Sequence, residues 1–164
     1  MLIHRITSQK PTRLSKHYYL NADGKLNKQP GGALVRGKVE PIEVPGLTGF
    51  AELLQSLTPA QALTYGGPGA DAALVTKEEF AKAGRPQGAV PRANSHFVWQ
   101  AAPGVMMVDH DPADDGPALS RDDLVTAIRA AVPGLADAAM VWWPSSSSHI
   151  VNGDTGEDMT GLRG

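Results

Sequence analysis

The stretch Val105-Met106-Met107-Val108-Asp109-His110-Asp111-Pro112 decides the expected fold, because four apolar residues lead into two aspartates and a proline. In a strand, successive side chains point to opposite faces, so Asp109 and Asp111 would share a face and His110 would point away. Two carboxylates on one face repel each other unless a cation neutralises them, and Mg²⁺ is commonly held by one or two carboxylates. The stretch therefore predicts a strand that ends in a metal site, with an acidic turn as the alternative.

The residues after this strand predict a crossover to a second strand. Ser120 is a good N-cap for a helix over Arg121–Val132, which carries an apolar stripe and is followed by Pro133-Gly134. Ala139–Trp143 has the composition of a buried strand. Strand, helix and strand over residues 104–143 favour two parallel strands joined by a right-handed connection.

A serine run, Ser145–Ser148, follows the second expected strand and leads into His149. Hydroxyls, backbone N–H groups and a protonated histidine could hold phosphate oxygens there. The alternative is a flexible serine loop with a surface histidine. A serine nucleophile is disfavoured, because no G-x-S-x-G elbow is present.

The N-terminal half predicts short strands before any helix. Residues 1–15 read as poorly ordered, and an Asp-Gly turn at residues 21–24 predicts a hairpin over residues 16–28. Short strands are expected at Ala33–Arg36 and Val39–Val44, and Pro41 limits the second one to an edge of the sheet.

Three short helices and one strand are expected next. Thr48 would cap a helix over Phe50–Leu57, and Thr58-Pro59-Ala60-Gln61 has the pattern of a capping box that opens a second helix. Thr76-Lys77-Glu78-Glu79 would open a third helix, which Gly84 ends. Residues 85–95 read as a polar loop, and His96–Gln100 as a short strand.

Composition narrows the class of protein. The 164 residues suffice for one domain, and the absence of cysteine excludes disulfides and thiolate zinc sites. No apolar run approaches the roughly 18–20 residues that a membrane helix needs, and residues 1–5 lack a long apolar leader. We therefore expect a cytoplasmic protein with no membrane partner.

Charge is unevenly spread along the chain. Residues 1–39 carry eight Lys/Arg against one acidic residue, a net charge of +7, whereas residues 101–164 carry three Arg against ten acidic residues, a net charge of −7. A basic N-terminal part (residues 1–39, called the basic front) and an acidic C-terminal part suit binding of a polyanion near a metal site. A basic, partly disordered tail is the alternative.

The motifs together resemble the archaeo-eukaryotic primase superfamily, especially the primase–polymerases of plasmids, phages and integrated elements. Val108-Asp109-His110-Asp111 is similar to the first family motif, an apolar strand that ends in D-x-D or D-x-E. Ser147-Ser148-His149 is similar to the second, and the intervening helix with a separation of about 40 residues suits a β-α-β linkage. Gly161-Leu162-Arg163-Gly164 is similar to the segment before the third motif. The chain looks truncated there, because the strand that should supply another acidic residue would begin where the chain stops.

The resemblance implies a DNA primase/polymerase-type nucleotidyltransferase that acts in mobile-element replication. Asp109 and Asp111 would hold Mg²⁺ or Mn²⁺, and His149 with Ser147 would bind the nucleoside triphosphate, with Arg163 as a further phosphate contact. The basic front, with Arg85 and Arg92, would track the phosphates of a single-stranded or primed DNA template. A helicase domain or protein downstream is an implied partner.

The expected fold class is α/β (α+β), with a mixed, partly parallel sheet and flanking helices that resemble the primase–polymerase core with its RRM-like unit. The expected domains are a flexible basic N-terminus at residues 1–15 and a single, C-terminally incomplete catalytic domain at residues 16–164. Two other functions stay open: a catalytically inactive fragment that binds single-stranded DNA, and a metal-dependent phosphodiesterase.

Overall fold

A computed structural model describes the chain except for residues 100, 111–118, 145–149, 158 and 160–164. The chain divides into two compact units, Met1–Met106 and Met107–Gly164. No helix in the part that the structure describes is long and apolar enough to cross a membrane.

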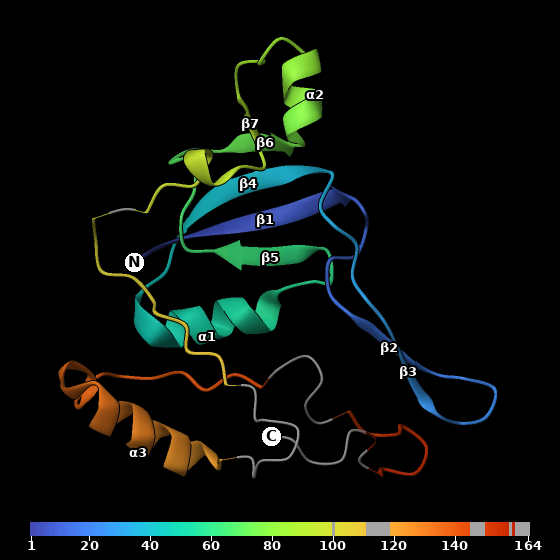
Figure 1. Cartoon of the computed structure of the whole chain (residues 1–164), viewed down its shortest axis with the longest axis vertical. Coiled ribbons are helices and arrows are strands. Elements are labelled where there is room, and N and C mark those ends of the chain that lie inside the picture. The colour runs from blue at the N-terminus through green and yellow to red at the C-terminus, as the bar shows by residue number, and fades with distance from the viewer. Residues whose placement is uncertain (100, 111–118, 145–149, 158, 160–164) are drawn as a thin grey trace. The chain divides into compact units, whose positions relative to one another are not determined.

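The first unit is built on a five-stranded sheet with the strand order β5-β1-β4-β6-β7 (Figure 1). Its strands are β1 (Leu2–Lys10), β4 (Arg36–Glu43), β5 (Gln61–Thr64), β6 (Ala72–Val75) and β7 (Ala89–Pro91). Neighbouring strands are antiparallel except for β6 and β7, which are parallel. The expectation of a mixed, partly parallel sheet is therefore confirmed at this coarse level.

The parallel pair comes from a β-α-β unit that sequence reasoning did not place. Helix α2 (Lys77–Lys82) connects β6 to β7 and begins as expected at Thr76, whose hydroxyl accepts the N–H of Glu79 at 3.1 Å. Gly84 follows the helix with a φ of +69°, a conformation that glycine adopts without strain. Strand β7 lies inside the segment 85–95 that was expected to be a polar loop.

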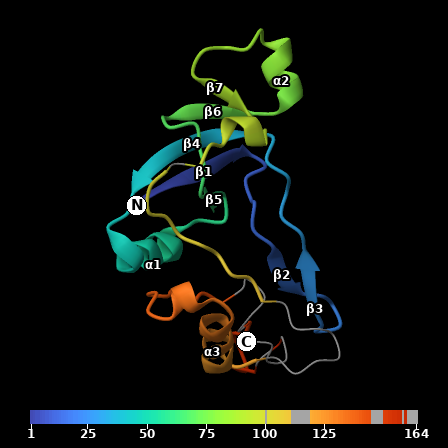
Figure 2. The same cartoon turned by 60° about the vertical axis from the view of Figure 1, so that its left-hand side comes forward.

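A second, two-stranded sheet forms the ribbon of β2 (His17–Leu20) and β3 (Leu26–Gln29), which confirms the predicted hairpin. The side chain of Asn21 shapes the turn, because its Oδ1 accepts the N–H groups of Asp23 and Lys25 at 3.1 and 2.8 Å. The ribbon extends away from the five-stranded sheet in both views (Figures 1 and 2).

The core of the first unit lies between the sheet and α1 (Gly46–Ser56). Phe50 and Leu53 of α1 are buried against Ile3 and Val44, and Val105 packs beside them. Phe50 and Leu53 are three positions apart, so they lie on the same face of α1. Thr48 does not cap the helix, because α1 begins at Gly46 with no side-chain cap.

The other face of the sheet buries a histidine. His4 is fully buried on β1, and neither of its ring nitrogens has a hydrogen-bond partner within the described residues. Gly67 lies so close to the imidazole that a Cβ on this glycine would overlap the ring. Gly67 also forms an isolated antiparallel bridge with Val98, where a strand over residues 96–100 was expected. A 3₁₀ turn, η1 (Asn94–His96), precedes this bridge instead.

Several expectations for the N-terminal half were wrong because strand pairing overrides local signals. The segment expected to be flexible contains β1, which pairs with both β4 and β5. Strand β4 is central, and Pro41 is tolerated because the pairing with β6 ends at Val39. Residues 33–35 are outside any strand, and β4 begins at Arg36.

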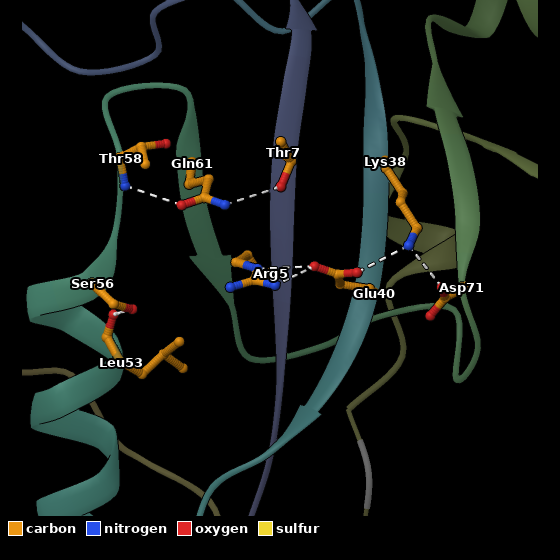
Figure 3. Close-up of polar contacts among 9 residues, drawn as sticks. All are labelled: Arg5, Thr7, Lys38, Glu40, Leu53, Ser56, Thr58, Gln61 and Asp71. Atoms are coloured by element: carbon orange, nitrogen blue, oxygen red, sulfur yellow. Dashed lines mark hydrogen bonds and ion pairs between the residues drawn. The ribbon is translucent and has the colours of Figure 1, made fainter.

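The capping box at Thr58 does not open a helix. Gln61 Oε1 accepts the N–H of Thr58 at 3.0 Å, as in a capping box, but its Nε2 donates to Thr7 Oγ1 at 3.4 Å (Figure 3). The chain turns here and continues as β5, which pairs with β1. The local motif was recognised correctly, and its structural consequence was not.

The second unit contains α3 (Arg121–Ala131) and the 3₁₀ turn η2 (Pro133–Leu135). Ser120 caps α3 as predicted, since its hydroxyl accepts the N–H of Asp123 at 3.2 Å. The expected strands on either side are absent from residues 105–110 and 139–143. Met107 and Trp143 are exposed, so an apolar composition without a neighbouring strand did not suffice to make these segments strands.

Candidate nucleic-acid interface

Exposed cations gather on the ribbon and on the segment that leads into it. Residues 10–29 carry five Lys/Arg against one acidic residue, a net charge of +4. The five are Lys10, Arg13, Lys16, Lys25 and Lys28, and all are exposed. None of them forms an ion pair within the described ranges, so their charge is available to a polyanion.

The cations of the five-stranded sheet differ, because acidic side chains neutralise them. Arg5 Nη2 lies 2.6 Å from Glu40 Oε1, and Lys38 Nζ lies 2.9 Å from Glu40 Oε2 (Figure 3). Lys38 also contacts Asp71 Oδ2 at 2.8 Å. The hydrogen bond from Lys38, and to a smaller extent the one from Arg5, lowers the pKa of Glu40. The hydrogen bond to Asp71, and to a smaller extent the one to Glu40, raises the pKa of Lys38.

A hollow of about 390 Å³ lies beside this network, over the paired strands β4 and β6. Arg36, Lys38 and Asp71 line it, and Arg36 Nη2 pairs with Glu79 Oε1 at 3.2 Å. Because both cations already have carboxylate partners, the hollow offers an anion less charge than the ribbon does.

Aromatic side chains add a second feature to the ribbon. The rings of His17 and Tyr19 stack with their centroids 5.9 Å apart and their planes 19° from parallel. His17 pairs with Gln29 and Tyr19 with Asn27 across the ribbon, so these four side chains share one face. Exposed rings among unpaired cations are the elements with which proteins bind single-stranded nucleic acids.

Most residues of the expected metal and nucleotide site are outside the part of the chain that the structure describes. Asp111, Ser147, His149 and Arg163 are outside the described residues. Asp109 is described, and it is exposed in a segment that is not a strand. Within the described ranges, no group of three or more His, Asp and Glu side chains is placed to hold a metal ion. The metal site therefore stays a prediction from sequence.

The two arginines expected to assist the basic front have different surroundings. Arg92 Nη1 donates to the carbonyl oxygen of Leu34 at 2.6 Å, which ties the loop after β7 to the segment before β4. Arg85 has a φ of +59° directly after Gly84 and lies in the turn behind α2. Neither residue belongs to the ribbon.

No protein-family model matches this chain, and no curated protein and no solved structure is significantly similar to it. Functional inference therefore rests on the chain's own residues.

Sequence reasoning identified the basic front and the hairpin but missed the ring pair. His17 and Tyr19 are two positions apart in a predicted strand, and such residues share a face. Alternating aromatic side chains within a run of lysines were the signal that could have found this surface.

Proposed function

We propose that this protein binds single-stranded nucleic acid through the β2–β3 ribbon and the cationic segment that precedes it. The observation that carries the proposal is the contrast between the two sets of cations. Arg5, Arg36 and Lys38 on the sheet are paired with carboxylates, whereas the five cations of residues 10–29 have no such partner in the described part of the chain. Unpaired cations gain most from contact with phosphates, because binding releases the counterions of the nucleic acid.

Salt dependence of binding tests this proposal. We expect the affinity for an oligothymidylate, measured by fluorescence anisotropy, to fall as salt rises. The logarithmic slope should approach about −0.7 per phosphate contact, or about −3.5 for five contacts. Removing two lysines together, Lys25→Ala and Lys28→Ala, should reduce the magnitude of the slope by about 1.4.

The matched control is Lys77→Ala together with Lys82→Ala, which also removes two positive charges. Both lysines lie on α2, where Lys82 pairs with Glu78 at 2.6 Å, so this double variant changes the net charge without touching the ribbon. An equal loss of affinity in the α2 variant would show that only net charge matters. Binding by the wild-type chain that is insensitive to salt would contradict the proposal.

A second candidate function is metal-dependent nucleotidyl transfer of the primase–polymerase type. It is supported by the D-x-D sequence of Asp109 and Asp111, the downstream Ser147 and His149, and the exposure of Asp109. The two carboxylates would hold Mg²⁺ or Mn²⁺, and the nucleoside triphosphate would contact Ser147, His149 and Arg163.

Template-dependent incorporation of nucleotides with added Mn²⁺ tests this second candidate. Replacing both Asp109 and Asp111 with alanine should abolish incorporation and leave binding by the ribbon intact. Incorporation that survives this double substitution would contradict the candidate. Release of nucleotides from DNA without added triphosphates would indicate a phosphodiesterase instead.

A further inference from the structure

We infer that one face of the ribbon, defined by His17, Tyr19, Asn27 and Gln29, binds nucleic-acid bases by stacking, and is therefore selective for single strands over duplexes. This inference rests on the proposed function and names the group of the ligand that is recognised. It is carried by the ring geometry, which the charge argument does not use.

The strand register places the rings where a base can reach them. Tyr19 is 47% exposed and His17 is exposed, and their rings lie on the face opposite to Tyr18 and Leu20. Because the rings stack on each other with their planes 19° apart, a base can extend the stack on the outer face of either ring. A stack of two rings on a strand thus forms a platform for adjacent nucleotides.

The ribbon leaves this platform uncovered. Strands β2 and β3 pair with each other, and neither makes an extensive contact with another helix or strand of the described chain. Figures 1 and 2 show the ribbon directed away from the five-stranded sheet. The amide groups of Asn27 and Gln29, across from the rings, offer both donors and acceptors to base edges.

Charge and rings together specify the chemistry of the ligand. Lys16 directly precedes His17, and Lys28 pairs with Tyr18 on the other face of the ribbon, so both cations lie beside the platform without being part of it. Phosphates can contact these lysines while bases stack on the rings. In a duplex the base faces are already stacked on one another, which removes the surface that the platform would contact.

Comparison of oligonucleotides that differ only in their bases tests the inference. We expect an oligothymidylate to bind about 5- to 150-fold more tightly than an abasic oligonucleotide of equal length, which corresponds to the stacking of one base. A 2-aminopurine placed in the strand should lose fluorescence on binding, because stacking quenches it. An oligouridylate should bind through the same platform. Whichever strand, deoxyribose or ribose, binds with the higher affinity is the preferred ligand.

Variants on the two faces of the ribbon sharpen the test. Tyr19→Ala should lower the affinity for oligothymidylate by at least about fivefold and leave the affinity for the abasic strand unchanged. Tyr19→Phe keeps the ring and should restore binding, which separates loss of stacking from loss of folding. Leu20→Ala, on the opposite face, should leave both affinities unchanged.

The possible failures are distinguishable. Equal affinity for abasic and base-bearing strands, with no effect of Tyr19→Ala, overturns the stacking inference and leaves phosphate binding intact. Binding to a duplex that is as tight as binding to the single strand also overturns it. Absence of salt-dependent binding to any strand overturns the proposed function itself.

Discussion

At the scale of single residues, His4 makes the first unit sensitive to pH, because it is a titratable side chain that the sheet buries completely. Burial lowers its pKa below the ordinary value of 6.5, because the charged form would lose its hydration without gaining a partner. The folded state therefore favours the neutral imidazole.

The sign of this effect gives a prediction for acid stability. As the pH falls below about 6.5, the unfolded chain binds a proton that folded His4 resists, so the free energy of unfolding should decrease. The decrease levels off below the folded pKa. Urea unfolding followed by tryptophan fluorescence should show a smaller acid loss in His4→Leu than in the wild type. Identical pH profiles would contradict the assignment.

Gly67 offers a second test at this scale. A Cβ at this position would overlap the His4 ring, so Gly67→Ala should destabilise the first unit by about 1–3 kcal/mol through overpacking. Gly104→Ala is the control, since the nearest atom to its Cβ would be an oxygen 4.0 Å away. Equal unfolding free energies for the two variants would show that the sheet accommodates the methyl group.

At the scale of elements, the helix caps show what sequence alone can predict. The caps of α2 and α3 depend on Thr76 and Ser120, each of which binds a backbone N–H three residues away. Such contacts are local, and both were predicted. The turn at Thr58 depends on a contact between Gln61 and the distant Thr7, and α1 begins without any side-chain cap. Both of these were predicted wrongly.

Two threonine substitutions, one at a helix cap and one inside a helix, test this difference between local and distant contacts. Thr76→Ala should cost about 1 kcal/mol of stability, because the N–H of Glu79 loses its acceptor. Thr48→Ala should cost nothing measurable, since Thr48 lies within α1 and caps no group. Thermal unfolding of both variants compares them directly. A loss at Thr48 as large as the loss at Thr76 would contradict the observed start of α1.

Strand pairing explains the remaining errors for the sheet. Residues 7–13 are polar, which suggested a flexible segment, yet Thr7 and Ser8 belong to a strand with a neighbour on each side. Conversely, residues 105–108 are apolar, which suggested a buried strand, yet Met106 and Met107 are exposed. The polarity of a segment predicts its burial only when the strands that pair with it are known, and a single sequence does not identify those strands.

At the scale of the whole molecule, the two units differ in how much they bury. The first unit contains every buried side chain of the described residues, among them Ile3, Val39 and Leu74. The described residues of the second unit include none, and eight of its large apolar side chains are exposed. These are Met107, Val108, Leu119, Val132, Met140, Trp142, Trp143 and Val151.

This difference predicts unequal resistance to proteolysis. Segments with few buried contacts open at a low free-energy cost, so thermolysin should cleave residues 107–164 before residues 1–106. Mass spectrometry should detect an early fragment that ends near Met106 and retains the signal of a folded sheet in circular dichroism. Simultaneous loss of both parts would indicate a single cooperative unit.

Strand β1 lies inside the sheet, between β5 and β4, and this position has a consequence for how the sheet forms. This strand is synthesised before either of its neighbours, β4 and β5, and the ribbon and α1 are made in between. Contacts between residues so far apart in the chain form slowly, because each closes a long loop. On the ribosome, β1 can pair with β4 once residues 36–43 have emerged, but its other edge stays open until residues 61–64 follow. Polar residues on β1, such as Arg5 and Thr7, keep that open edge from associating with other nascent chains.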